Sequence, residues 1–296
     1  MKKIIKVAIA AGVIIGAGVG GFYCLNGMVE KDLNNSIKNI NESGFADISG
    51  DVSVNVILGT LKIKDLKIKS GESVQEGDVK VKGLNFLDKK NLFSNEVSIY
   101  FDNYRSEYST NYYSDNSFVI SKEGESKINI KAVSSFVGEE NQGKLKQEYA
   151  VNISDVNGLY DTLTKDVSQL IVNDASLNPM LYIGQMSNAK VDKFVLTIKN
   201  DDFIKKALRE AAKQDGASAE DVDKYIVEQI KEMVPLNNQE SVLSFYNSDK
   251  SSLILTFTNK SKKPLMSIYS EMFNHGNSTT AISNNYDIES QNIPGA

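Results

Sequence analysis

From residue 51 to residue 154 the chain alternates apolar and polar side chains with a period of two. This period places successive side chains on opposite faces of a strand, so it is typical of strands with one buried and one solvated face. Gly-containing turns, such as those at Gly71 and Gly124, separate the alternating segments. We therefore expect a long antiparallel β meander of roughly seven to nine strands in this region. The alternating apolar residues are Val52, Val54, Val56, Leu61, Ile63, Leu66, Ile68, Val79, Val81, Val97, Ile99, Phe101, Phe118, Ile120, Ile128, Ile130, Tyr149, Val151 and Ile153.

Residues 201–235 instead carry apolar side chains at helical spacing. Asp201 or Asp202 is suited to cap a first helix, which Gly216 ends. Ser218 opens a second helix with an approximate capping box, and Pro235 stops it. A short helix is expected over 240–247, and strands over 190–199 and 252–259 flank these helices. The pattern predicts a helical hairpin between two strands.

These patterns together predict an α+β fold class, with one N-terminal transmembrane helix, a long antiparallel β meander and a helical hairpin inserted near the C-terminus. The tail is rich in Asn, Ser and Thr, a composition typical of disorder. The expected parts are a cytoplasmic stub (1–6), a transmembrane anchor (7–25), a juxtamembrane linker or helix (26–50), a β-rich region (51–154), an α+β region (155–273) and a disordered tail (274–296).

An uncharged run from Val7 to Leu25 predicts how the protein is held in the cell. Its 19 residues would extend about 28 Å as a helix, close to the thickness of one bilayer core. Three lysines precede the run, which favours a cytoplasmic N-terminus. We expect a single-pass protein of the bacterial inner membrane whose main domain is periplasmic. A cleaved signal peptide is one alternative, and a lipoprotein processed at Cys24 is another.

Small residues recur every four positions inside this run, at Ala8, Gly12, Gly16 and Gly20. On a helix they would share one face, where small side chains let a second helix approach closely. They are therefore a candidate contact for a homodimer or for another envelope protein. The alternative is that Gly and Ala are simply common in such segments.

Five tyrosines cluster near the middle of the expected meander, and four of them recur every four residues: Tyr100, Tyr104, Tyr108 and Tyr112. In a strand, this even spacing would place the four on one face. They could then form an aromatic core face with cross-strand packing. They could also form the wall of a groove for an acyl chain or a sugar.

Lysines occupy the polar positions of the early strands, at Lys62, Lys64, Lys67, Lys69, Lys80 and Lys82. One interpretation is a solvated strand face that resists aggregation. The other is contact with anionic lipid headgroups, because this region follows closely after the expected anchor.

Several kinds of chemistry are disfavoured by the composition. The chain has one His and one Cys, too few ligands for a zinc or haem site, and His275 lies in the expected tail. No phosphate-binding or nucleophile-elbow motif is present. A net charge of −5 argues against nucleic-acid binding. We therefore expect no cofactor, no metal and no enzymatic activity, although a carboxylate pair in a cleft would escape this reasoning.

The order of these parts resembles known bacterial envelope proteins. After the basic start and the uncharged run, residues 59–69 read Gly-Thr-Leu-Lys-Ile-Lys-Asp-Leu-Lys-Ile-Lys. This segment is similar to the amphipathic first strands of AsmA-like proteins, and the arrangement over residues 1–130 also resembles the YdgA-like family. The resemblance implies a role in envelope lipid homeostasis, through β grooves that shield acyl chains. This chain is much shorter and lacks an obvious repeated groove, and no family site residues match.

Two hypotheses for function follow. The first is a non-enzymatic, membrane-anchored periplasmic protein that binds membrane lipid. The second is a structural or assembly partner of another envelope protein, dimerising through its membrane segment.

Overall fold

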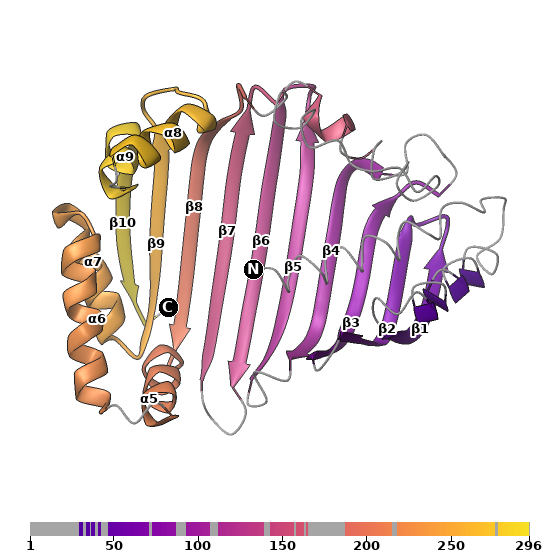
Figure 1. Ribbon diagram of the computed structural model, residues 1–296, viewed down its shortest axis with the longest axis horizontal. Coiled ribbons are helices and arrows are strands. Elements are labelled where there is room, and N and C mark those ends of the chain that lie inside the picture. The colour runs from indigo at the N-terminus through magenta and orange to yellow at the C-terminus, as the bar shows by residue number, and fades with distance from the viewer. Residues whose placement is uncertain are drawn as a thin grey trace. The chain divides into compact units, whose positions relative to one another are not determined.

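The computed structural model describes residues 30–31, 34–35, 37–38, 41–42, 47–70, 73–86, 93–106, 112–138, 143–156, 158–162, 164, 187–214, 218–275 and 278–295. Within them, ten strands form one sheet in which every strand lies beside its neighbour in sequence (Figure 1). The strands are β1 (Asp47–Asn55), β2 (Thr60–Ser70), β3 (Ser73–Leu84), β4 (Phe93–Ser106), β5 (Tyr112–Glu123), β6 (Lys127–Gly138), β7 (Lys144–Ser154), β8 (Lys190–Asp201), β9 (Lys250–Asn259) and β10 (Tyr286–Pro294). The helices are α5 (Ile204–Gln214), α6 (Ala219–Met233), α7 (Leu236–Asn247), α8 (Leu265–His275) and α9 (Ser278–Asn285).

The expected fold class, an α+β chain with a transmembrane helix and a helical hairpin after the meander, is wrong. The meander does not end at residue 154 but continues through β8, β9 and β10. The helices are inserted between these strands: α5, α6 and α7 separate β8 from β9, which nevertheless pair along their lengths. Periodicity locates single strands, but it does not reveal that strands separated by three helices pair with each other.

The expected transmembrane helix is not among the helices that the structure describes. None of the helices in the described part of the chain is long and apolar enough to cross a membrane. The expected anchor, residues 7–25, lies outside the described residues.

The expected disordered tail contains a helix and an edge strand. Residues 278–285 form α9, and residues 286–294 form β10, which pairs with β9 over its full length. The strand is mostly polar, but Tyr286 is buried and Ile288 lies opposite Phe257. Backbone pairing with an apolar neighbour therefore orders a segment whose composition alone is typical of disorder.

The chain divides into two compact units. The first unit contains β1 to β4, most of β5, Lys127 and Ile128 of β6, and the described residues between 156 and 164. Its core lies on the apolar face of β1 to β4, where Leu61, Ile63 and Val81 are almost fully buried. This confirms that the alternation in residues 51–101 separates a buried face from a solvated one.

Two β-bulges in this unit follow one pattern. Asp65 in β2 and Asn103 in β4 have positive φ angles of 50° and 54°, which Asp and Asn adopt more readily than most residues. In each case an aspartate on the next strand accepts the backbone N–H of the bulged residue at 2.8 Å: Asp78 for Asp65, and Asp115 for Asn103. Each bulge inserts one extra residue into its strand and so changes which side chains share a face.

The second unit contains β7 to β10, residues 129–138 of β6 and the five helices named above. Leu196 and Ile198 of β8 lie opposite Leu255 and Leu253 of β9, so one face of this part of the sheet is apolar.

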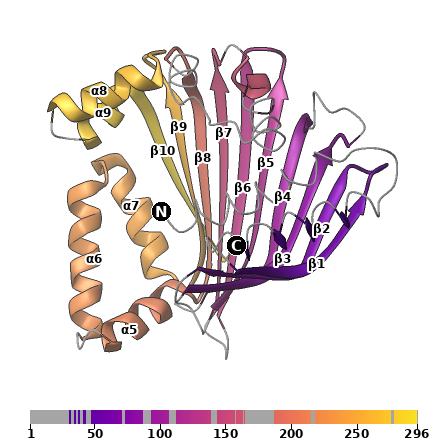
Figure 2. The same cartoon turned by 45° about the vertical axis from the view of Figure 1, so that its right-hand side comes forward.

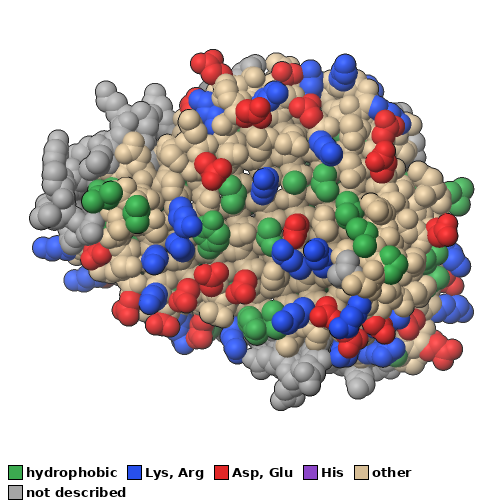
Figure 3. Space-filling model, turned by 180° about the vertical axis from the view of Figure 1, so that it is seen from behind, with side chains coloured by type: hydrophobic (Ala, Val, Ile, Leu, Met, Phe, Trp, Pro, Cys, Tyr) green, Lys and Arg blue, Asp and Glu red, His purple; other side chains and the backbone are tan. Residues whose placement is uncertain are grey.

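On the molecular face shown in Figure 3, basic and acidic side chains are interspersed and hydrophobic side chains form only small groups. Such a polar face is typical of an antiparallel sheet that is solvated on one side.

Candidate functional site

An apolar pocket of about 440 Å³ lies in the second unit, between helices α6, α7 and α9 and strands β8 to β10. Its volume falls within the range of small-molecule sites, roughly 300–1,000 Å³. All of its lining residues except Asn238 and Tyr246 are apolar. They are Ile198, Ile230, Val234, Pro235, Asn238, Val242, Phe245, Tyr246, Leu253, Leu255, Phe257, Ile282 and Ile288.

The sheet supplies one wall of the pocket through strand register. Ile198 of β8 lies opposite Leu253 of β9, and Phe257 of β9 lies opposite Ile288 of β10. Directly opposed residues of antiparallel strands share a face, so these side chains form a continuous apolar surface. Aromatic rings extend it: the centroids of Phe257 and Phe194 are 5.5 Å apart, and those of Phe194 and Tyr149 are 6.4 Å apart.

The helices supply the opposite wall. Helix α6 begins as expected at Ser218, whose hydroxyl accepts the N–H of Asp221 at 3.1 Å, and it ends before Pro235. Ile230 and Val234 are four residues apart and so lie on one side of this helical segment. Helix α7 packs on β9 and β10 and lies between α6 and β10 (Figure 2). The pocket is therefore lined by α6, α7, three strands of the second unit and Ile282 of α9.

The two polar lining residues are already hydrogen-bonded. The Asn238 side-chain oxygen accepts a hydrogen bond from the Ser290 hydroxyl at 2.8 Å, and the Tyr246 hydroxyl donates to the Asp223 carboxylate at 2.6 Å. Burial raises the pKa of Tyr246, and the hydrogen bond and charge of Asp223 raise it further, against a smaller lowering by Arg209. The phenol is therefore neutral at physiological pH. The lining residues present an apolar surface with no ionised group.

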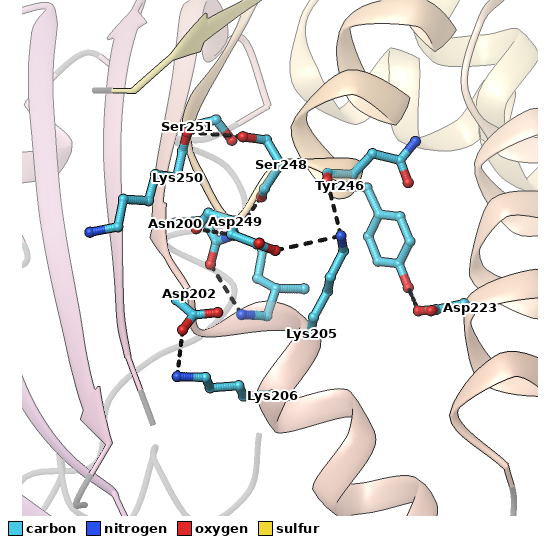
Figure 4. Close-up of polar contacts among 12 residues, drawn as sticks. Asn200, Asp202, Lys205, Lys206, Asp223, Tyr246, Ser248, Asp249, Lys250 and Ser251 are labelled. Carbon is cyan, nitrogen blue, oxygen red and sulfur yellow. Dashed lines mark hydrogen bonds and ion pairs between the residues drawn. The ribbon is translucent and has the colours of Figure 1, made fainter. Parts of the chain in front are cut away.

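A network of polar contacts fixes the start of α5 beside the β8–β9 pair (Figure 4). Asn200 is 2% exposed, and its side-chain oxygen accepts the N–H groups of Phe203 and Ile204, each at 3.1 Å. Its amide nitrogen donates to the Ser248 carbonyl at 3.2 Å. The Lys205 ammonium donates to the Asn247 carbonyl, at the end of α7, at 2.9 Å. These contacts tie both ends of the helical insertion to the sheet.

The expected caps of α5 have other roles. Asp201 forms an ion pair with Lys250 at 3.0 Å. Asp202 forms one with Lys206, which Figure 4 shows. Asn200 caps the helix because it is buried at the end of β8, where its side chain reaches the first free N–H groups.

The structure does not bring the candidate tyrosines to one face. The bulge at Asn103 makes Phe101 pair with Asn116 and Tyr104 pair with Ser114, so Tyr104 lies on the core side. There it lines a small cleft with Leu66 and Ile68, and burial raises its pKa. Tyr100 lies on the other face, where the Lys82 ammonium is 5.1 Å from its ring centroid.

The remaining candidates are only partly described. Tyr108 lies outside the described residues, and Tyr112 opens β5 on a different strand from Tyr100. The small-residue stripe of Ala8, Gly12, Gly16 and Gly20 lies outside the described residues. Within the described part of the chain, no three His, Cys, Asp or Glu side chains lie close enough together to hold a metal ion.

Sequence reasoning missed the pocket itself. Ile230 and Leu253 were recognisable as members of apolar helix and strand faces, but such faces normally form a closed core. Only the packing of α7 on the strands and of α6 on α7 leaves a space beside the sheet. No local sequence signal distinguishes a lined pocket from a filled core.

The fold and the site define a class: an antiparallel β-sheet protein with an apolar, ligand-sized pocket beneath inserted helices. A family model described as an uncharacterized protein matches residues 142–283. This span includes every residue that lines the pocket except Ile288. A comparison with curated proteins finds no match.

Proposed function

We propose that this protein is a non-enzymatic lipid-binding protein of the bacterial envelope that holds an acyl chain in the pocket of its second unit. The observation that carries the proposal is the apolar lining of this 440 Å³ pocket, with its two polar residues already bonded. Each methylene that leaves water for such a surface contributes about 0.8 kcal/mol, so an acyl chain is a suitable occupant.

The amino-terminal sequence supports a location at the membrane. The uncharged run from Val7 to Leu25 would hold the chain at the bacterial inner membrane, with its N-terminus cytoplasmic and residues 47–295 in the periplasm. A binding protein in this position has membrane lipid as its nearest source of acyl chains.

Photo-crosslinking of the full chain in lipid nanodiscs tests the proposal. The discs contain a phosphatidylglycerol with a diazirine in one acyl chain, and mass spectrometry locates the crosslinked peptides after irradiation. We expect crosslinks in peptides that contain Ile230, Val242 and Leu253. Crosslinks confined to residues 7–25 would show contact with bulk lipid only and would contradict the proposal.

Two variants of α7 provide the matched comparison. Val242→Trp places a large ring in the pocket and is expected to abolish the crosslinks there. Glu240→Trp adds the same ring at an exposed position of the same helix and is expected to leave the crosslinks unchanged. Equal crosslinking of both variants would show that the lipid lies elsewhere.

The second candidate function is assembly with another envelope protein. It is favoured by Met266 and Tyr269, two exposed apolar side chains three residues apart on α8. Amine crosslinking of the full chain in native membranes tests this function. A discrete heterologous product that is lost in the Met266→Ser variant supports it, and monomer alone contradicts it.

A further inference from the structure

The hairpin between β1 and β2 ends in two neighbouring, highly exposed aliphatic side chains. Ile57 is 93% exposed and Leu58 is 70% exposed. Single exposed aliphatic residues are ordinary on protein surfaces, but two adjacent ones at the end of a hairpin form a small projecting apolar surface. We call residues 56–59 the hairpin tip.

The hairpin tip has a fixed conformation. The Asn55 side-chain oxygen accepts the N–H of Leu58 at 2.9 Å, and the Gly59 carbonyl accepts the N–H of Leu84 at 3.0 Å. Gly59 has φ +57°, and a Cβ there would lie 2.1 Å from the Leu84 carbonyl oxygen. The two aliphatic side chains are therefore held outward by a turn that is bonded to the end of β3.

Three lysines beside the tip form a positive cluster, which consists of Lys62, Lys80 and Lys82. Lys62 lies directly opposite Lys80, and Lys82 lies opposite Thr60, the first residue of β2 after the tip. Their neighbours on β1 and β4 are Ser53, Tyr100 and Ser98, none of which is acidic.

The close approach of these lysines destabilises the sheet when no anion lies nearby. Like charges directly opposite each other on neighbouring strands destabilise a sheet. Among the residues that the structure describes, no acidic side chain forms an ion pair with the lysine cluster, although Lys67 further along β2 pairs with Glu76 at 2.5 Å. An external anionic surface would offset the repulsion.

The start of the described chain lies at the same end of the hairpin. The Glu30 carboxylate accepts the N–H of Val54 at 2.8 Å, three residues before Ile57. The uncharged run ends at Leu25, five residues before Glu30, a distance that an extended chain spans in at most about 18 Å. If residues 7–25 hold the protein in a membrane, as the proposed function states, the hairpin tip lies close to the membrane surface.

We propose that the hairpin tip and the lysine cluster dock on the surface of an anionic phospholipid bilayer. Interfacial apolar side chains enter about 5–10 Å below the headgroups. Ile57 and Leu58 reach this depth while Lys82 and Lys62, a few residues further along the strands, meet the phosphates. This contact holds the first unit against the membrane from which lipid would be taken.

A fluorescent probe at the tip tests the proposal in the full chain. Cys24→Ser removes the native thiol, and Leu58→Cys accepts an environment-sensitive NBD label. The protein is incorporated into nanodiscs of phosphatidylglycerol or of phosphatidylcholine. We expect blue-shifted NBD emission in phosphatidylglycerol discs and a smaller shift in phosphatidylcholine discs. A label at Leu236→Cys, an 86% exposed position in the second unit, is the control and is expected not to shift.

The lysine contribution is measured separately. Replacing Lys62, Lys80 and Lys82 by Gln lowers the ratio of inserted to free label about fivefold per lysine in phosphatidylglycerol discs. The matched control replaces Lys199, Lys224 and Lys231, which are exposed lysines of the second unit, and leaves the ratio unchanged.

Three results would overturn the proposal. Equal emission at positions 58 and 236 in protein that co-elutes with the discs rejects docking but leaves the membrane anchor intact. A shift at position 58 that is the same in both lipids and in detergent indicates a protein contact instead. A chain that does not co-elute with discs at all rejects the anchor itself, and the docking proposal with it.

Discussion

The hydroxyl of Tyr246 on α7 donates a hydrogen bond of 2.6 Å to the Asp223 carboxylate on α6. Helix α6 packs against α5 and α7, whereas α7 packs on β9 and β10. The bond therefore holds the outer helix of the pocket to the helix that touches the sheet. It lies beside the candidate site and fixes the distance between two of the helices that line it.

Removing this hydroxyl is expected to loosen α6. Tyr246→Phe leaves the ring in place but lowers the free energy of unfolding by about 1.5 kcal/mol, because the lost bond has a charged acceptor. Urea unfolding measures the change, and amide hydrogen exchange is expected to quicken in α6 more than in β9. Tyr225→Phe, at an exposed position of α6, is the control. Equal effects of the two substitutions would contradict the structural role of the bond.

The rigidity of the hairpin tip depends on Gly59. Gly59→Ala combines a positive φ with a contact of 2.1 Å to the Leu84 carbonyl oxygen, so the backbone has to move. Gly124→Ala has a similar φ of +65°, but its Cβ would meet nothing within 4 Å. We expect the Gly124 variant to lose about 1 kcal/mol from backbone strain alone. The Gly59 variant is expected to lose at least about 2 kcal/mol more, as measured by thermal unfolding.

The bulge in β4 predicts different roles for two tyrosines four residues apart. Tyr104→Ala removes a ring from the core side of the first unit and is expected to cost about 3 kcal/mol. Tyr100→Ala removes a ring from the lysine face and is expected to cost less than about 1 kcal/mol. Denaturant unfolding of the two variants distinguishes these values. Equal losses would mean that the tyrosines share a face.

Tyr160 is expected to make stability depend on pH in the alkaline range. Burial, then the charges of Asp161 and Glu96, raise the pKa of Tyr160 from 10.0 to about 12, and its hydroxyl donates to the Ser94 carbonyl at 2.5 Å. Between these values the unfolded chain has released the proton while the folded chain keeps it, so stability falls as pH rises.

The stabilising contribution of Tyr160 is therefore complete below pH 10 and lost as pH rises through about 12. Unfolding in urea at a series of pH values measures it. We expect Tyr160→Phe to lose less stability over this range than the parent protein, whereas the exposed Tyr225→Phe follows the parent. Parallel curves for the parent and Tyr160→Phe would contradict the assignment.

Local sequence signals predicted the individual elements well. The alternation around Val79 and Val81 gave a strand with a buried face, and Ser218 and Pro235 gave the bounds of α6. These predictions succeeded because side-chain period, caps and breakers act within a few residues. The lysine positions of β2 and β3 were equally visible, since charged residues at alternate positions lie on the solvated face.

Relationships between distant residues were decided only by tertiary structure. The pairing of β8 with β9 across three helices turned the expected α+β chain into one continuous meander, and pairing with β9 ordered the polar strand β10. The bulge at Asn103 separated Tyr100 from Tyr104, which an unbroken strand would have kept together. The pocket exists because α7 packs on β9 and β10 and α6 packs on α7 without the helices filling the space beside the sheet. In each case the deciding energy comes from backbone pairing or packing between segments far apart in the chain, which no local pattern contains.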